Sequence, residues 1–506
     1  MADALPTSSK IAVVGAGTMG SGIAHVAARA GHPVYMLDSF PGACERGKKA
    51  IEKDLAFLVG RGKLAREEAD AIAARIHPVH KMMAMSDAAL VIEAIAEDAE
   101  AKRTLYRGLE AEVSPDCVIA SNTSSLSITA LAQGMAHPGR LIGMHFFNPA
   151  PRMPLVEVVS GLASDPDIVA RIGATATAWG KTPVHATSTP GFIVNRVARP
   201  YYGEAMRFLT EQAGTPATLD AVMRDCGGFA MGPCELMDLI GLDVNLSVSA
   251  SVFQAIAYDR RYAPSLLQQE LVRAGRMGRK SGEGFFRYDE GARNPVPADQ
   301  AALEAGGKIA VVGELDPLQP LLDRLSGAGV DIKLSEGSAH VEIGAANVAL
   351  TDGRTATRRA AEEHRRDLVL IDLCADYAKC TRVAVTRADQ CRELSYQAVV
   401  GNLQKAGLTV TPVADIAGMA VMRCVAMLAN EAADVLTQGI ADAADIDTAM
   451  RLGTSYPIGP LAWADQLGAG FVVEVLENLR AHYGEERYRV SPALNRVRWN
   501  GGKFHA

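Results

Sequence analysis

Hydrophobic residues in the first part of the chain form short β-branched runs, and segments with helical spacing separate these runs. Residues 10–14 (KIAVV) predict a buried strand, 21–30 predict a helix, and 33–38 (PVYMLD) predict a second strand. Similar apolar runs, which predict further strands, occupy 88–94, 117–120, 141–147 and 155–159. Strands that alternate with helices indicate an α/β Rossmann domain built on a doubly wound sheet.

Two longer stretches keep a helical pattern with few strand signals. Residues 43–77 are charged, with a break at 60–63 (GRGK), and predict a helical hairpin inserted before the strand at 88–94. From Phe192 to about Leu271 the hydrophobic positions again have helical spacing, which predicts a separate all-α domain. Prolines and glycines after this domain predict a linker.

The chain then contains a second, shorter copy of the same arrangement. Residues 308–313 repeat 10–15, but Glu314-Leu-Asp-Pro-Leu318 follows in place of a glycine-rich loop. Residues 418–468 align without gaps on 191–241, with 15 identities in 51 positions, which indicates an internal duplication. The two repeats lie 298 and 227 positions apart, so the second copy is about 71 residues shorter before its helical part.

The predicted organisation therefore has four domains of two kinds, in agreement with a length of 506 residues. The predicted parts are a Rossmann domain (1–190), an all-α domain (191–290), a linker (291–307), a truncated, degenerate Rossmann-like domain (308–410) and a second all-α domain (411–506).

Composition and charge narrow the functional classes. Apolar residues make up 48% and charged residues 22% of the chain, which excludes a disordered or collagen-like protein. The net charge of −7 gives no basic surface for nucleic acid or an anionic membrane, and no apolar run reaches the ~20 residues of a membrane span. The eight cysteines form no C-x-x-C pair, so we expect reduced thiols, no metal site and a cytoplasmic protein.

The turn after the first strand predicts a dinucleotide site. Gly15-Ala-Gly17-Thr18-Met19-Gly20 joins strand to helix, and Asp38 ends the next strand. Glycines let the backbone approach a pyrophosphate at the helix N-terminus, and the carboxylate would accept hydrogen bonds from ribose hydroxyls. Because a carboxylate repels a 2′-phosphate, NAD is favoured over NADP. The alternative is a structural turn with an acid that caps a helix.

A second group of polar residues belongs to later strands and the loops after them. Ser121-Asn-Thr-Ser124-Ser125 follows one strand, His145 lies in the next, and Glu157 lies in the run after that. Each alone has a structural explanation, as a loop cap or as a core residue. A His–Glu pair, however, would satisfy both buried groups, and the carboxylate would fix the imidazole tautomer and raise its basicity.

Four segments together resemble the L-3-hydroxyacyl-CoA dehydrogenase family. They are Ser121-Asn-Thr-Ser-Ser-Leu126, His145-Phe-Phe-Asn-Pro149, Leu155-Val-Glu-Val158 and Thr189-Pro-Gly-Phe-Ile-Val-Asn-Arg196. Their order and spacing agree with the family throughout 10–290, and 278–285 (GRKSGEGF) resembles the end of its helical domain. The duplicated architecture resembles the longer bacterial members, which act on 3-hydroxyadipyl-CoA in phenylacetate breakdown.

The resemblance implies a role for each residue of the site. His145 is the general base that takes the proton of the 3-hydroxyl, Glu157 orients it, and Ser124 and Asn195 hold the reacting oxygen and the thioester region. The implied cofactor contacts are Gly15, Gly17, Thr18, Met19, Gly20, Asp38, Glu97, Lys102, Ser124, Asn148 and Lys280. Solvated charges are the alternative for Glu97, Lys102 and Lys280.

The resemblance also places coenzyme A on the helical insert. Arg61 and Lys63 are the candidates for its phosphates, with an ordinary solvated helical face as the alternative. Asp54 stands where relatives can carry a serine contact, and a carboxylate near phosphates is unfavourable.

The second copy is expected to be catalytically silent. Met422 stands at the position aligned with Asn195 and cannot make its hydrogen bonds. The shortening is expected to remove the stretch that would carry the His145 motif. A structural role follows, in which the second helical domain covers the apolar surface of the first, so a 1–290 fragment is expected to dimerise or aggregate.

The expected function is NAD-dependent oxidation of an (S)-3-hydroxyacyl-CoA, with 3-hydroxyadipyl-CoA as the expected substrate. The alternatives are 3-hydroxybutyryl-CoA, a sugar acid on the same scaffold, and a non-catalytic, crystallin-like NAD-binding protein. An acyl-CoA is the expected partner molecule, neither nucleic acid nor a membrane is expected, and a homo-oligomer is compatible with the sequence.

Overall fold

The computed structural model describes residues 3–313, 317–335 and 340–505. Contacts between residues divide the chain into two compact units. The first unit contains Met1–Arg196 and Gln438–Thr454, and the second unit contains Val197–Thr437 and Ser455–Ala506. A segment of the second helical repeat therefore belongs to the same compact unit as the first Rossmann domain.

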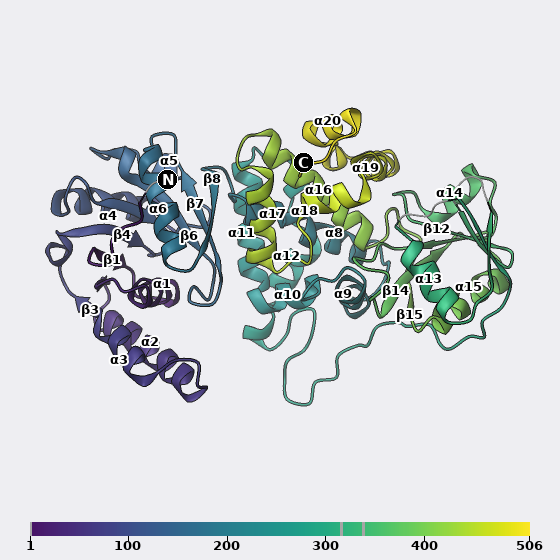
Figure 1. Ribbon diagram of the computed structural model, residues 1–506, viewed down its shortest axis with the longest axis horizontal. Helices are drawn as coiled ribbons and strands as arrows, with labels where there is room; N and C mark the ends of the chain where they lie inside the picture. Colours follow the sequence, from purple (N-terminus) through teal and green to yellow (C-terminus); the bar gives the residue numbers. More distant parts are fainter. Residues whose placement is uncertain (1–2, 314–316, 336–339, 506) are drawn as a thin grey trace. The chain divides into compact units, whose positions relative to one another are not determined.

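The first unit is built on one eight-stranded sheet, which confirms the predicted Rossmann domain (Figure 1). Its strand order is β3-β2-β1-β4-β5-β6-β7-β8. The strands are β1 (Lys10–Val14), β2 (Val34–Leu37), β3 (Ile76–Val79), β4 (Ala88–Glu93), β5 (Val118–Ser121), β6 (Leu141–Phe146), β7 (Leu155–Ser160) and β8 (Thr182–Thr187). Neighbours are parallel except β6 and β7, which are antiparallel and place His145 opposite Glu157.

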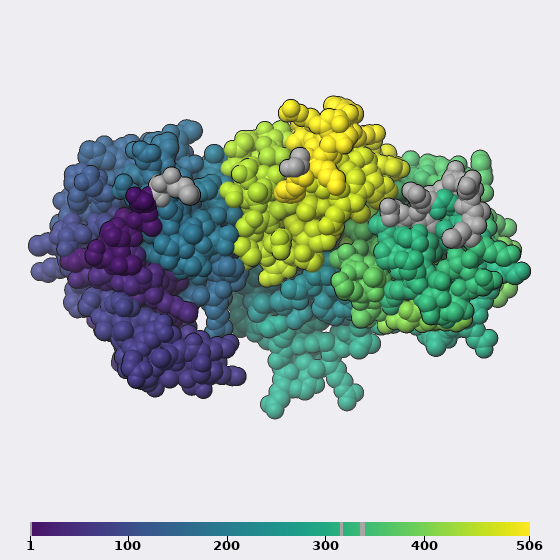
Figure 2. Space-filling model, viewed as in Figure 1, coloured from purple at the N-terminus to yellow at the C-terminus, as the bar shows by residue number. Residues whose placement is uncertain are grey.

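Helices join these strands. They are α1 (Thr18–Arg29), α2 (Ala43–Gly60), α3 (Arg66–Ala74), α4 (Ala99–Glu112), α5 (Ile128–Leu131), α6 (Pro166–Ala178), α7 (Val194–Val197) and α17 (Ala443–Thr454), with short 3-10 turns η1 (Met82–Met85) and η2 (Pro138–Arg140). The predicted hairpin is α2 with α3, and it projects from the body of the first unit (Figure 2). The edge strand β3, which contains Pro78, follows the hairpin and was not predicted.

The second unit contains a mixed seven-stranded sheet with the order β10-β9-β11-β12-β13-β14-β15. Its strands are β9 (Ile309–Val312), β10 (Ile332–Ser335), β11 (His340–Ile343), β12 (Ala346–Leu350), β13 (Leu368–Ile371), β14 (Arg382–Arg387) and β15 (Thr409–Pro412). The repeated strand at 309–312 is present, whereas the predicted change of the loop at 314–316 lies outside the described residues. Strand β11 is antiparallel to both of its neighbours.

The remaining helices of the second unit include most of both all-α repeats. They are α8 (Arg199–Thr210), α9 (Pro216–Asp225), α10 (Pro233–Ile240), α11 (Leu242–Ala255), α12 (Leu266–Arg273), α13 (Gln319–Gly327), α14 (Ala356–Glu362), α15 (Glu393–Lys405), α16 (Val421–Thr437), α18 (Pro460–Leu467), α19 (Ala469–Tyr483) and α20 (Pro492–Asn500), with 3-10 turns η3 (Arg260–Tyr262), η4 (Arg279–Ser281) and η5 (Glu486–Tyr488). Helix α16 is almost entirely buried because it packs on α8, α18, α19 and α20.

A comparison of the two copies corrects the predicted position of the shortening. Strands β13 and β14 and helix α15 begin 227 positions after β6, β7 and α6, so this part of the second copy is complete. The missing residues instead lie between β10 and β12, where β11 replaces the elements from α2 to α4. The position of His145 is therefore retained in the second copy, and Asp372 occupies it.

Two further findings concern the whole described chain. All eight cysteines are buried and unpaired, as the sequence predicts. Within the ranges that the structure describes, no single helix is long and apolar enough to cross a membrane. One bent pair, α10 with α11, meets that test on length and composition alone.

Candidate active site

The loop between β1 and α1 has the shape that a bound dinucleotide requires. Gly15 has φ +101°, and a Cβ atom there would lie 2.5 Å from the carbonyl oxygen of Ala94. A Cβ atom on Gly17 would meet nothing within 4 Å, and no side chain caps α1 at this residue. The first N–H groups of α1 can therefore receive a pyrophosphate at Gly17, so the residues present fit NAD.

Asp38 closes the same site at the end of β2. One carboxylate oxygen accepts the backbone N–H of Ala16 at 2.7 Å, and the other accepts that of Phe40 at 2.8 Å. The acid is half-buried and fixed beside the loop. Of the first two residues of α1, Thr18 lines the neighbouring cavity, whereas Met19 packs against the hydrophobic core.

Glu97 organises the polar loop that follows β5. One of its oxygens accepts hydrogen bonds from the Thr123 hydroxyl at 2.6 Å and from the backbone N–H groups of Ser124 at 3.0 Å and Ser125 at 3.1 Å. The other oxygen lies 3.3 Å from Lys102 Nζ. Although burial disfavours the charged form, these hydrogen bonds and the ammonium group lower the pKa of Glu97. The loop that carries Ser124 is thus tied to a carboxylate.

Lys102 lies in a buried ion pair rather than on the surface. Its side chain is 1% exposed, and Nζ is 2.5 Å from the buried Glu93. Glu93 also accepts from the hydroxyl groups of Tyr106 at 2.7 Å and Ser121 at 2.8 Å. Sequence reasoning missed Glu93 and Tyr106, although a glutamate within the predicted apolar run 88–94 was a usable signal. Lys102 therefore links Glu97 to the buried Glu93. A direct contact of Lys102 with NAD stays a prediction.

His145 and Glu157 form a buried pair across β6 and β7. His145 Nδ1 lies 2.6 Å from one oxygen of Glu157, and both residues are buried. The other oxygen accepts the backbone N–H groups of Ile193 at 3.0 Å and Val194 at 2.9 Å. Because Nδ1 is engaged by the carboxylate, Nε2 is the ring nitrogen with which His145 can exchange a proton.

The segment that binds Glu157 also carries Asn195. Asn195 Nδ2 donates to the backbone oxygen of Ser124 at 3.3 Å. Within the first unit, the segment 193–195 therefore connects two hydrogen-bonded pairs, His145 with Glu157 and Asn195 with Ser124.

A cavity of about 630 Å³ opens beside the glycine loop, between α1, α2 and the loop after β6. Asn148 lines it, and its charged residues are Arg46, Lys53, Asp54 and Arg152. Three cations face one carboxylate, which suits an anionic ligand.

The two residues predicted to contact coenzyme A follow the end of α2, the helix that lines one side of this cavity. Arg61 and Lys63 are exposed in the turn after α2 and do not line the cavity. The Arg61 guanidinium lies 5.3 Å from the centre of the Phe57 ring, and Phe57 does line the cavity. Arg61 is therefore connected to the cavity through this ring.

Lys280 belongs to the second unit. It lies in the turn η4, and its Nζ forms an ion pair with Asp243 at 2.5 Å. Its predicted contact with the cofactor stays a prediction.

The equivalent site of the second copy has a different chemistry. Asp372, which takes the position of His145, is fully buried and accepts the backbone N–H groups of Ala420 at 2.9 Å, Val421 at 2.8 Å and Met422 at 2.9 Å. Burial raises the pKa of Asp372. Ala384 takes the position of Glu157. The second copy thus keeps the bond from a carboxylate to the turn, but it has no imidazole there for proton transfer.

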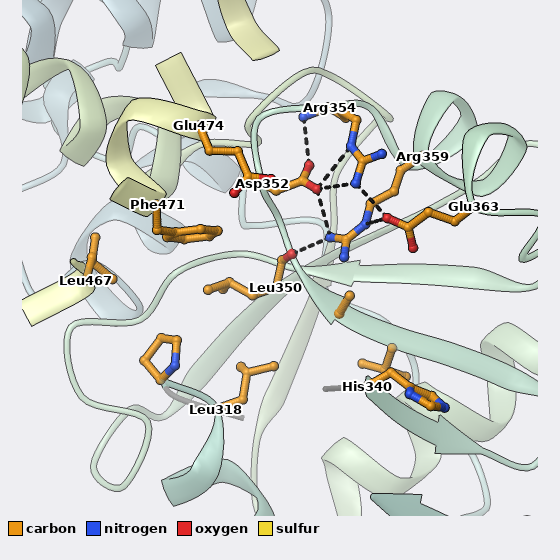
Figure 3. Close-up of a pocket in the computed structure, with 13 residues that line it drawn as sticks. Leu318, His340, Leu350, Asp352, Arg354, Arg359, Glu363, Leu467, Phe471 and Glu474 are labelled. Carbon is orange, nitrogen blue, oxygen red and sulfur yellow. Dashed lines mark hydrogen bonds and ion pairs between the residues drawn. The ribbon is translucent and has the colours of Figure 1, made fainter. Parts of the chain in front are cut away.

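A pocket of about 460 Å³ in the second unit adjoins the loop after β12 (Figure 3). Arg354 and Arg359 turn toward Asp352 and Glu363 in this view. Arg354 lies 2.6 Å from both carboxylates, and Arg359 lies 2.8 Å from Glu363 and 3.3 Å from Asp352. Because these cations are paired within the pocket wall, we assign no anionic ligand to this pocket.

Comparisons with known proteins match described domain families along both copies. The family described as "3-hydroxyacyl-CoA dehydrogenase, NAD binding domain" matches residues 10–189, and its C-terminal domain matches both 191–288 and 418–503. A third description, "3-hydroxybutyryl-CoA dehydrogenase reduced Rossmann-fold domain", matches residues 348–416. The second copy is thus also similar to proteins of this kind.

Individual relatives fall into long and short forms. The chain is 46% identical to a 3-hydroxyadipyl-CoA dehydrogenase of Escherichia coli (strain K12), over 95% of each chain. It is 41% identical to a probable 3-hydroxybutyryl-CoA dehydrogenase of Deinococcus radiodurans, over 55% of this chain and 100% of that one. A crystal structure described as 3-hydroxybutyryl-CoA dehydrogenase from Escherichia coli K12 has a TM-score of 0.89 and 42% identity, and the match covers 98% of this chain and 99% of that one.

Proposed function

The chain belongs to the 3-hydroxyacyl-CoA dehydrogenase family, and on this premise we propose that its substrate is 3-hydroxyadipyl-CoA. The chain oxidises a 3-hydroxyacyl-CoA with NAD, so the proposal concerns the acyl chain. The observation that carries it is the 46% identity to a 3-hydroxyadipyl-CoA dehydrogenase over 95% of both chains. The second candidate is 3-hydroxybutyryl-CoA, because the solved structure that matches nearly the whole chain is described as a 3-hydroxybutyryl-CoA dehydrogenase.

In the proposed mechanism His145 is the general base. Its Nε2 atom takes the proton of the 3-hydroxyl group, and Glu157 holds Nδ1 and stabilises the imidazolium that forms. When bound over Gly17 and Asp38, NAD supplies the acceptor for the hydride of C3. The antiparallel register of β6 and β7 supports this assignment, because it keeps the imidazole and the carboxylate opposite each other.

Ser124 and Asn195 position the substrate in this proposal. Their polar groups hold the reacting oxygen and the thioester region, so that C3 faces the nicotinamide. The link from Asn195 to the backbone oxygen of Ser124 supports a joint role. Glu97 then acts through the Ser124 loop that it binds, and Asn148, Lys102 and Lys280 remain proposed cofactor contacts.

The coenzyme A part of the substrate is assigned to the cavity beside α2. The cations Arg46, Lys53 and Arg152 on its wall support this assignment, since coenzyme A carries phosphate groups. Arg61 and Lys63 would meet the phosphates that extend beyond the cavity. We also propose a cytoplasmic location, where NAD and coenzyme A thioesters are both present.

A comparison of substrates tests the proposal. The reverse reaction with NADH is followed for 3-oxoadipyl-CoA and acetoacetyl-CoA, and free 3-hydroxy acids and sugar acids are tested with NAD. We expect kcat/KM to be about tenfold or more higher for 3-oxoadipyl-CoA, because a site that pairs a second carboxylate discriminates strongly against a chain that lacks it. Equal or higher kcat/KM for acetoacetyl-CoA would contradict the adipyl assignment. Turnover of sugar acids alone would exclude both acyl-CoA candidates.

A further inference from the structure

We infer that the segment Gln438–Thr454 of the second copy is a positioning element for the active site of the first. This segment contains α17, and it belongs to the first unit. The inference rests on the roles proposed above for Glu157 and Asn195. It gives the second copy a part in the reaction, although that copy lacks a counterpart of the dyad, the pair of His145 and Glu157.

The segment first of all closes the open edge of the sheet. Strand β8 is the outermost strand next to β7, so its outward N–H groups need partners from elsewhere. The N–H of Thr187 donates to the carbonyl oxygen of Ile440 at 2.9 Å, and the N–H of His185 donates to the Asp445 carboxylate at 2.8 Å. The second copy thus provides the partners of β8, and β8 supports the strand that carries Glu157.

Helix α17 also approaches the dyad from the side of β7. A Cβ atom on Gly453 would lie 2.8 Å from Leu155 Cδ2 and 3.0 Å from Val194 Cγ2. Leu155 lies two residues before Glu157, on the same face of the strand. Val194 donates its N–H to the Glu157 carboxylate at 2.9 Å. Helix α17 therefore packs both on β7, which carries Glu157, and on the turn that contains Val194, the donor to Glu157.

A third contact reaches the segment of Asn195. The side-chain oxygen of Gln438 accepts a hydrogen bond from Arg196 at 2.8 Å. Arg196 is buried and directly follows Asn195, which is tied to Ser124. The three contacts together fix β8, β7 and the turn between Ile193 and Arg196, which carry or support two of the four proposed active-site residues.

The second unit independently contains the reciprocal arrangement. The N–H of Ala414 donates to the carbonyl oxygen of Ala213 at 3.0 Å. Ala414 lies 227 positions after Thr187, and Ala213 lies 227 positions before Ile440, so this bond is the counterpart of the bond in the first unit. In each unit, a helical repeat of one copy completes the sheet of the other. The contact is therefore a repeated feature of the duplication.

A matched pair of glycine variants tests the inference in the full chain. Gly453→Ala introduces the Cβ atom that would press on Leu155 and Val194. Gly470→Ala makes the same change in the helix α19, where a Cβ atom would meet nothing within 4 Å. Alanine has a higher helix propensity than glycine at both positions, so the two variants differ only in the packing around the new Cβ atom. We expect Gly453→Ala to lower kcat about tenfold and Gly470→Ala to leave it unchanged.

The accompanying measurements separate positioning from general damage. The Kd of NADH, from fluorescence titration, is expected to stay the same, because β1 and its glycine loop lie across the sheet from β8. Leu155→Val removes the nearest atom, so the double variant Gly453→Ala/Leu155→Val is expected to recover most of kcat. Failure of this rescue, or equal kcat for the two glycine variants, would overturn the inference.

A milder variant covers the case in which Gly453→Ala does not fold. Gln438→Ala removes the oxygen that binds Arg196 and is expected to lower kcat severalfold without changing NADH binding. Unchanged kcat in that variant would overturn the inference. His145→Gln, measured in parallel, tests the proposed roles separately, since full activity of that variant would reject the dyad and not the contact of α17.

Discussion

At the scale of single residues, the pairing of His145 with Glu157 has the largest consequence. Two polar groups are buried in adjacent strands, and each is the partner that the other needs. Removing either side chain leaves the facing atom of the other, His145 Nδ1 or one oxygen of Glu157, buried without that partner, at a cost of about 1–3 kcal/mol or more for a charged group. The same pairing leaves Nε2 as the ring nitrogen for the proton transfer that we propose.

Substitution of the dyad gives the first prediction at this scale. We expect His145→Gln and Glu157→Gln to lower kcat by about two or more orders of magnitude, while the Kd of NADH stays within twofold. The exposed His80→Gln is the matched control and should retain wild-type kcat. Retention of more than a tenth of kcat in His145→Gln would contradict its role as the base.

A second prediction concerns Glu97, whose pKa is lowered in the folded state. A lowered carboxyl pKa adds stability that is complete above the unfolded value of about 4.3 and is lost as the pH falls through the folded value. We therefore expect Glu97→Gln to lower Tm by a constant amount from pH 8 to about pH 5, and by less at lower pH.

Thermal unfolding of both proteins across this range measures the difference. The exposed Glu52→Gln is the control, and its Tm is expected to match that of the unsubstituted protein. A difference in Tm that already narrows between pH 8 and pH 6 would contradict the account.

At the scale of secondary-structure elements, β13 shows how the second copy kept its fold without the His–Glu pair of the first copy. Strand β13 begins 227 positions after β6, and Asp372 occupies the position of His145. The aspartate binds the N–H groups of Ala420 and Val421, which correspond to Ile193 and Val194 in the first copy. One residue thus performs the structural part of what Glu157 does, which leaves the opposite strand free to carry Ala384.

This interpretation predicts that Asp372 contributes to stability and not to turnover. Asp372→Ala leaves at least three buried N–H groups without their acceptor, so we expect the free energy of unfolding to fall by about 3 kcal/mol or more. Denaturant unfolding measures this loss, and kcat of the folded protein is expected to remain within twofold. A large loss of kcat with unchanged stability would show that the second copy has a chemical role.

At the scale of the whole molecule, the compact units do not follow the order of the copies along the chain. The sequence predicts a break near residue 190 and another near 308, whereas contacts place Gln438–Thr454 with the first Rossmann domain. The partners of β8 are therefore about 250 residues away from it along the chain.

A 1–290 fragment provides the prediction at this scale. The fragment lacks Ile440 and Asp445, so the N–H groups of Thr187 and His185 lose their partners. It also lacks α16, which packs on α8 in the full chain, so the face of α8 that α16 covers becomes exposed in the fragment. We expect the fragment to dimerise or aggregate, as measured by size-exclusion chromatography with light scattering. A monomeric fragment with full activity would contradict this expectation.

The sequence alone determined the features that depend on near neighbours. Strand runs, the glycine loop, Asp38, and the spacing of His145 and Glu157 follow from local periodicity and from the needs of buried polar groups, and they led to the fold class, the family and the cofactor. The sequence analysis misjudged the site of the shortening, because β13 and β14 keep the 227-position offset but carry Asp372 and Ala384 in place of the residues that would mark them as copies of β6 and β7.

Only the tertiary structure decided which distant groups meet. The burial of Lys102 between Glu93 and Glu97 and the packing of Gly453 on Leu155 have no signature in local patterns. Hydrophobic periodicity reports whether a residue is buried, but not against what. A contact across hundreds of residues is selected by the shape and the hydrogen-bonding needs of the assembled sheets and helices. Here that selection placed a segment of the second copy against Leu155 and Val194 of the first.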